Sequence, residues 1–148
     1  MKVPPLVQVL VAGAFAWGLS EGLPVWQFDG ALVTVAVWIA SIAGAGFLAI
    51  ALNIFRIHKT TFDPLNPSKA QKLVVSGLYR ITRNPMYVGM AFLLLGWCLY
   101  LGDVIAFLAI ALFVVSMNHL QIKAEESALQ DNFGDDYLRY TQRVRRWL

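Results

Sequence analysis

Two clusters of charged residues have the types and spacing needed to bind a polar ligand. One is the acidic pair Glu125 and Glu126, whose carboxylates can take ammonium or hydroxyl groups, or else pair with nearby basic side chains. The other is Arg80 and Arg83, just before Asn84-Pro85. Because Asn favours the N-cap and Pro the first helical position, this dipeptide predicts a helix start. That helix start and the arginines could hold a carboxylate or phosphate, or form only an ordinary cap in a basic region.

Other kinds of catalytic site are not indicated. His58 and His119 lack the companion ligands of a zinc site, so no metal is expected. No glycine-rich loop opens a helix, which argues against a Rossmann nucleotide site. Cys98 is the single cysteine and lies in an apolar stretch, where packing is favoured over nucleophilic catalysis. Any chemistry therefore depends on the acidic pair and the arginines.

The composition indicates a membrane protein. Hydrophobic residues make up 58% of the 148 residues and charged residues 14%, whereas soluble domains carry about 25% charged residues. This balance excludes a small soluble domain and a disordered chain, and one cysteine excludes a disulfide scaffold. The net charge of +3 is expected to mark a cytoplasmic membrane face, not a nucleic-acid-binding surface.

Four uncharged apolar stretches predict an all-α membrane protein with four transmembrane helices in one domain, residues 1–148. The stretches approach or exceed the length of about 20 helical residues that spans a bilayer. The first could also be a signal peptide, but its small-residue cleavage pattern falls inside the apolar run, so we favour a retained helix. The predicted spans are 3–20, 31–55, 85–102 and 104–122.

The basic residues sort to one side of these spans. Residues 1–2, the loop 56–84 and the tail 123–148 contain all 12 lysines and arginines. By the positive-inside rule, both termini, this loop and this tail are cytoplasmic, and we expect an inner-membrane protein. The two remaining connections carry only acidic charges, and the short one at Gly102-Asp103 predicts a helical hairpin. Both charged clusters therefore lie on the cytoplasmic side.

The tail predicts two helical pieces. The fourth span continues through the acidic pair to Phe133, with Gly134 as its C-cap, and a final helix starts at Asp135 or Asp136. This final helix is amphipathic, so it either lies in the membrane interface or folds over the site as a lid. One side of it carries Tyr137, Tyr140, Val144 and Trp147, and another carries Arg139, Arg143 and Arg146.

Two motifs in the C-terminal half resemble the isoprenylcysteine carboxyl methyltransferase and phospholipid methyltransferase superfamily. Residues 73–89, LVVSGLYRITRNPMYVG, are similar to its signature L-V-x-x-G-x-Y-x-x-x-R-[HN]-P-x-Y-x-G. Residues 125–144, which begin EESALQDNFG, are similar to its tail E-E-x-x-L-x-x-x-F-G-x-x-Y-x-x-Y-x-x-x-V. The two motifs occur in the family's order and flank the predicted hairpin.

The resemblance implies methyl transfer from S-adenosylmethionine to a lipophilic acceptor, either an isoprenylcysteine-like carboxylate or a lipid headgroup, at the cytoplasmic face. In the family the cofactor lies between the first motif and the acidic pair. The implied cofactor contacts are Leu73, Val74, Tyr79, Arg83, Pro85, Tyr87, Gly89, Glu125 and Glu126. Within this set the carboxylates suit the cofactor's ammonium or ribose hydroxyls, and the arginine suits its carboxylate. The candidate catalytic residues are Arg83, Asn84 and His119.

Departures from the family pattern leave the acceptor open. Asn84 and Gln71 stand where relatives often carry histidine, and Asn118, His119 and Gln121 occupy the neighbourhood where isoprenylcysteine enzymes tend to carry arginine. For an amine or hydroxyl acceptor, His119 is a candidate general base, with polar packing as the alternative. Two other functions also remain open: an NADPH-dependent sterol-reductase-like enzyme, which shares an R-x-P-x-Y-x-G type motif, and a non-catalytic four-helix transporter or scaffold.

Overall fold

The computed structural model describes residues 3–57 and 73–148. Within this part of the chain the fold is all-helical, as predicted. Three short turns accompany the long helices: the 3₁₀ turns η2 (Gly77–Arg80) and η3 (Val104–Phe107) and the π-helical turn η4 (Met117–Ile122). The long helices are α1 (Pro5–Gly22), α2 (Ala31–Ile57), α3 (Pro85–Leu101), α4 (Leu108–Ser116) and α5 (Lys123–Arg143).

The outer surface of these helices is apolar. Large side chains such as Leu32, Trp38 and Ile42 are exposed on α2. A soluble protein rarely exposes so continuous an apolar surface, so this surface identifies a membrane protein. Within the described residues, α2 and the continuous helical run Val104–Arg143 are long and apolar enough to cross a bilayer, and α3 is a shorter apolar helix. That all four predicted segments cross remains a prediction.

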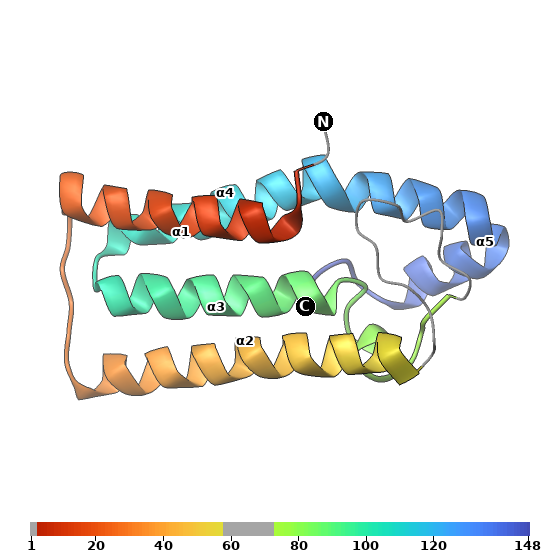
Figure 1. The fold of residues 1–148 in the computed structure, drawn as a ribbon, viewed down its shortest axis with the longest axis horizontal. Coiled ribbons are helices and arrows are strands. Elements are labelled where there is room, and N and C mark those ends of the chain that lie inside the picture. The colour runs from red at the N-terminus through yellow and green to blue at the C-terminus, as the bar shows by residue number, and fades with distance from the viewer. Residues whose placement is uncertain (1–2, 58–72) are drawn as a thin grey trace.

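The helices form an elongated antiparallel bundle (Figure 1). The start of α1, the end of α2, the start of α3 and the whole of α5 lie at one end of it (Figure 1). The links from α1 to α2 and from α3 to α4 lie at the opposite end. Both motifs, and the described segments that carry most of the basic residues, therefore lie at the first end.

Close backbone contact joins α2 to α3. A Cβ built on Gly44 would lie 2.8 Å from the carbonyl oxygen of Gly89, and one built on Gly89 would lie 2.9 Å from the carbonyl oxygen of Gly44. Small residues allow membrane helices to approach this closely. Gly44 therefore serves helix packing, whereas a Cβ built on Gly46 would meet open space among the described residues.

One buried carboxylate connects the links between helices at the end of the bundle opposite the motifs. Asp103 accepts hydrogen bonds from the backbone N–H groups of Val25 at 3.1 Å, Trp26 at 3.4 Å and Ile105 at 3.0 Å. Just before it, Gly102 ends α3 in the left-handed conformation, with φ of 66°. The predicted hairpin is thus formed, and Asp103 ties it to the link between α1 and α2.

Candidate active site

The two motifs meet inside the helical bundle. The hydroxyl of Tyr87 at the start of α3 donates a hydrogen bond to Oε1 of Glu125 in α5, at 2.5 Å. The side-chain amide of Gln121 in η4 donates to the same oxygen at 2.6 Å. Tyr87 is 1% exposed and Glu125 9% exposed. A buried carboxylate needs such donors, because each hydrogen bond offsets the loss of hydration.

The second carboxylate has charged partners. Glu126 lies 3.2 Å from Nη2 of Arg83, which belongs to the first motif. Arg146 donates to both carboxylate oxygens of Glu126, from Nε at 3.0 Å and from Nη2 at 2.6 Å. Hydrogen bonding to Glu126 raises the pKa of the Arg146 guanidinium, so this group stays charged. The two adjacent glutamates therefore have different partners: Glu125 accepts from Tyr87 and Gln121, and Glu126 lies between two guanidinium groups.

Arg83 has capacity for a further contact. Its Nε is buried and has no hydrogen-bond partner among the described residues. Its side chain is 15% exposed and its Nη2 is held by Glu126. An unpartnered guanidinium N–H beside a fixed one is suited to a carboxylate, which accepts hydrogen bonds in a forked arrangement.

The C-terminal segment, residues 144–148, lies across the first motif. The carbonyl oxygen of Arg145 accepts from the N–H of Arg83 at 2.8 Å, and that of Arg146 accepts from the hydroxyl of Thr82 at 3.1 Å. Thr82 and Arg145 form an isolated parallel bridge. The segment therefore covers the start of α3.

Asn84 is the N-cap residue of α3 and Pro85 opens the helix, as predicted. The Asn84 side chain makes no capping hydrogen bond in the described structure. The Asn84 amide instead donates to the carbonyl oxygen of Arg146 at 3.0 Å. This bond attaches the returning C-terminal segment to the start of α3.

The final helical piece packs against the protein through its aromatic side. Gly134 breaks α5 with φ of 51°, as its predicted capping role requires, and the chain turns back toward α3 (Figure 1). The hydroxyl of Tyr140 donates to the carbonyl oxygen of Tyr79 at 2.7 Å. Burial raises the pKa of Tyr137 to about 12 and raises those of Tyr79 and Tyr140 still further, so all three phenols are neutral at neutral pH. The aromatic side of this helical piece therefore contacts the first motif at Tyr79.

Not all predicted site residues gather at this cluster. Val74 and Pro85 are buried near it and Leu73 is half-buried, whereas Gly89 faces Gly44 in the contact between α2 and α3. His119 lies on the exposed side of η4, where its Nδ1 is 3.5 Å from Nζ of Lys123. Arg80 is exposed, and Gln71 and His58 lie outside the described residues. Within the described residues there is no cluster able to hold a metal ion.

Two members of the cluster, Gln121 and Arg146, were not assigned to it from the sequence. Gln121 precedes Glu125 by four residues, the spacing at which helical side chains meet, and this signal could have identified it. Arg146 carried no such signal, because it reaches Glu126 only after the chain reverses at Gly134.

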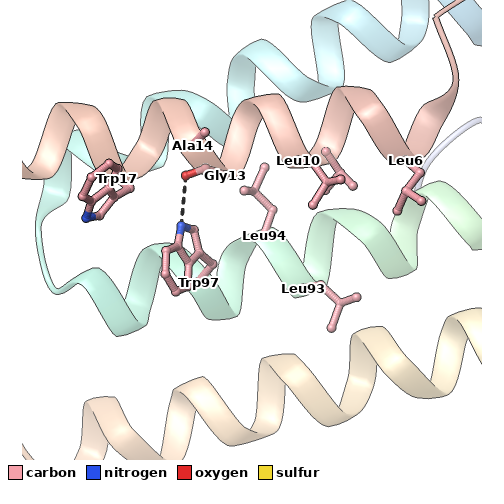
Figure 2. Close-up of a pocket in the computed structure, with 9 residues that line it drawn as sticks. Leu6, Leu10, Gly13, Ala14, Trp17, Leu93, Leu94 and Trp97 are labelled. Atoms are coloured by element: carbon pink, nitrogen blue, oxygen red, sulfur yellow. Dashed lines mark hydrogen bonds between the residues drawn. The ribbon is translucent and has the colours of Figure 1, made fainter.

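An apolar groove runs between α1 and α3 (Figure 2). It has a volume of about 460 Å³ and extends from Leu6, at the motif end of the bundle, to Trp17 and Trp97. The indole N–H of Trp97 donates to the carbonyl oxygen of Gly13 at 3.0 Å across the groove (Figure 2). Its lining consists of Leu6, Val9, Leu10, Gly13, Ala14, Trp17, Leu93, Leu94 and Trp97.

Comparison with known proteins links this arrangement to membrane methyltransferases. Residues 33–136 match the phospholipid methyltransferase family. An uncharacterized protein of Haemophilus influenzae is 46% identical over 63 residues, which are 43% of this chain and all of that protein. No solved structure matches the chain.

Two relatives carry enzyme names. The protein-S-isoprenylcysteine O-methyltransferase of Schizosaccharomyces pombe is 33% identical over 87 residues, 57% of this chain. Protein-S-isoprenylcysteine O-methyltransferase B of Arabidopsis thaliana is 37% identical over 73 residues, 49% of this chain. The matched region covers 37% of the length of each enzyme.

Proposed function

This chain belongs to the phospholipid methyltransferase family, and we propose that it transfers a methyl group from S-adenosylmethionine to a lipophilic acceptor. The acceptor would be an isoprenylcysteine-like carboxylate or a lipid headgroup. The reaction would take place at the end of the bundle where α3 starts and α5 lies (Figure 1).

The observation that carries the proposal is the contact between the two motifs. Tyr87 of the first motif contacts Glu125 of the second, and Arg83 contacts Glu126. Segments separated in sequence by a membrane hairpin thus bring two acids and a guanidinium into one small volume. That donor set matches a ligand that carries both an ammonium and a carboxylate group.

The residues present fit S-adenosylmethionine. The unpartnered Nε of Arg83 suits its α-carboxylate, and the carboxylates of Glu125 and Glu126 suit its α-ammonium and ribose hydroxyls. Leu73, Val74 and Tyr79 are apolar or aromatic groups able to enclose adenine. When bound, the sulfonium supplies a methyl group that the acceptor's nucleophilic atom takes by in-line displacement, and S-adenosylhomocysteine leaves. The side chains contribute by orienting both reactants, which can supply several kcal/mol of the barrier reduction, about 7–11 in well-aligned cases.

The groove between α1 and α3 suits the apolar part of the acceptor. All of its lining side chains are apolar or aromatic. Its end at Leu6 lies toward the end of the bundle that carries the motifs (Figure 2). A lipid chain held there would place its polar head near Tyr87 while the chain itself stays in the bilayer.

The proposal also includes the membrane topology of the chain. Four crossings with both termini in the cytoplasm would put the cluster on the side where a water-soluble methyl donor is available. In a bacterial cell this is the cytoplasmic face of the inner membrane. Cysteine substitutions at Gly22 and Asp135, labelled from either side with an impermeant maleimide, test this orientation directly.

Calorimetry in detergent tests the function. The wild-type protein is expected to bind S-adenosylmethionine, and Glu126→Ala to bind it at least tenfold more weakly, because the ligand loses a charged partner. Asp131→Ala removes an exposed carboxylate from the same helix and serves as the matched control. A wild-type protein that binds no methyl donor, or a Glu126→Ala variant that binds as tightly as wild type, would contradict the proposal.

A second assay identifies the acceptor. Membrane lipid extract incubated with the protein and a radiolabelled methyl donor should yield a labelled lipid after chromatographic separation. Label that requires a prenylated cysteine peptide would indicate the isoprenylcysteine class, and label in extracted phospholipid would indicate the headgroup class.

A further inference from the structure

Buried residues lie along one side of the helical run Val104–Arg143, from Ala109 to Glu125. Its buried positions recur at every fourth residue, a spacing that exceeds the 3.6 residues of an α-helical turn. In a continuous α-helix such positions drift by roughly 40° at each step, so the last ones would turn away from the first. The recurring buried residues are Ala109, Phe113, Met117, Gln121 and Glu125.

The π-helical turn η4 corrects this drift. It places extra residues in one turn of the helix, between Met117 and Ile122. Gln121 lies in this turn, 2% exposed, and Glu125 lies one turn beyond it. The turn therefore keeps both side chains on the buried face, opposite Tyr87. Single π-helical turns inside α-helices occur often at functional sites.

Two neutral donors then fix the same oxygen of Glu125. The Gln121 amide and the Tyr87 hydroxyl approach Oε1 at 2.6 Å and 2.5 Å from two different helices. Two such bonds restrict rotation of the carboxylate plane. These two donors are neutral groups, whereas the donors at Glu126 are guanidinium groups.

We infer that Gln121 is a positioning residue, which acts by holding the Glu125 carboxylate in the orientation that binds the α-ammonium group of the methyl donor. This inference rests on the proposed function. It differs from a purely structural role in one respect: loss of the amide should affect only ligands that carry the ammonium group.

Calorimetry with two ligands separates these roles. S-adenosylmethionine carries the amino acid group, whereas 5′-methylthioadenosine carries the same adenosine without it. For Gln121→Met, which keeps the approximate size and loses the donor, we expect about tenfold weaker binding of S-adenosylmethionine, as for loss of a hydrogen bond to a charged group. Binding of 5′-methylthioadenosine should be unchanged. Gln142→Met, at an exposed position of α5, is the matched control and should bind both ligands like wild type.

The outcomes distinguish the inference from the function on which it rests. Equal weakening of both ligands would mean that Gln121 only supports the fold, and unchanged binding of S-adenosylmethionine would mean that it does not act on Glu125. Either result overturns the inference while the proposed function stands. A wild-type protein that binds neither ligand overturns both. If Gln121→Met does not fold in detergent, Gln121→Leu decides the question, since it too removes the amide donor and adds no charge.

Discussion

Arg146 donates two hydrogen bonds to the carboxylate of Glu126, at 3.0 Å and 2.6 Å, although the two residues lie 20 positions apart. The contact is possible because the chain reverses at Gly134 and returns along its own helix. It brings the C-terminal segment onto the first motif, where the segment's carbonyl oxygens accept hydrogen bonds from Thr82 and Asn84. This ion pair thus joins the C-terminal segment to α5, while the same segment binds the first motif.

Loss of the Arg146 side chain should weaken this connection only modestly. The side chain is 35% exposed, so water and salt screen the pair, and its contribution to stability is under about 1 kcal/mol. We expect Arg146→Gln to lower the melting temperature in detergent by a few degrees at low salt and by less at high salt. Arg139→Gln, which removes a fully surface pair with Asp136, is the control. Equal shifts for both variants at low salt would contradict the role given to Arg146.

Loss of the Asp103 carboxylate should be much more costly. Asp103→Ala leaves three backbone N–H groups without their acceptor, at an expected cost of about 2–4 kcal/mol. Asp103→Asn keeps one acceptor oxygen and should lose less. Thermal unfolding followed by circular dichroism measures both, with exposed Asp29→Ala as the control. An Asp103→Ala variant as stable as the Asp29→Ala variant would show that this carboxylate does not tie the two links together.

The contact between α2 and α3 predicts opposite effects for two nearby glycines. In Gly44→Ala the new methyl group would lie 2.8 Å from the Gly89 carbonyl oxygen, so the helices must separate, at a cost of about 1–3 kcal/mol. In Gly46→Ala the methyl group meets open space, and the better helix former should leave stability unchanged or raise it by up to about 1 kcal/mol. Melting temperatures in the same detergent test this, and a larger loss for Gly46→Ala would be inconsistent with the packing.

Filling the groove should separate acceptor binding from cofactor binding. Ala14 lines the groove, and Ala14→Trp would occupy much of its volume of about 460 Å³. We expect methyl transfer to a long-chain acceptor to fall at least tenfold, while calorimetric binding of S-adenosylmethionine stays unchanged. Val11→Trp adds the same side chain to an exposed position of α1 outside the groove lining and is the control. Equal activity of the two variants would exclude the groove as the acceptor site.

His119 should be dispensable for methyl transfer. It is exposed, and its ring contacts Lys123 rather than the buried cluster. We therefore expect His119→Gln to retain activity within about twofold, with an unchanged pH profile. Loss of activity together with a changed pH profile would instead identify His119 as the general base considered from the sequence.

The periodicity and composition of the sequence were sufficient to predict the helices, because a bilayer requires helices of this length and apolarity. The start of α3 at Pro85 and the turn at Gly134 were predictable for a similar reason, since proline and glycine act locally. The contacts of Asn84, Asp103 and Arg146 were not predictable from the sequence. Each of them pairs with a backbone group or a charge that is distant in sequence, and such pairing depends on where the chain returns.

The π-helical turn was also beyond sequence reasoning. A period of 3.6 residues predicts the face that a side chain occupies only while the helix stays regular, and η4 interrupts it just before the acidic pair. The sequence could therefore place Glu125 and Glu126 on one element, but it could not show that Glu125 faces Tyr87 while Glu126 faces two arginines.

The C-terminal segment also sets an order of events during synthesis. Thr82, Arg83 and Asn84 are made well before the carbonyl oxygens of Arg145 and Arg146 that they bind. The membrane helices can therefore insert and pack while the ribosome is still translating the tail, but the start of α3 keeps unpaired polar groups until then. Premature termination before residue 145 would leave the polar groups at the start of α3 without these backbone acceptors.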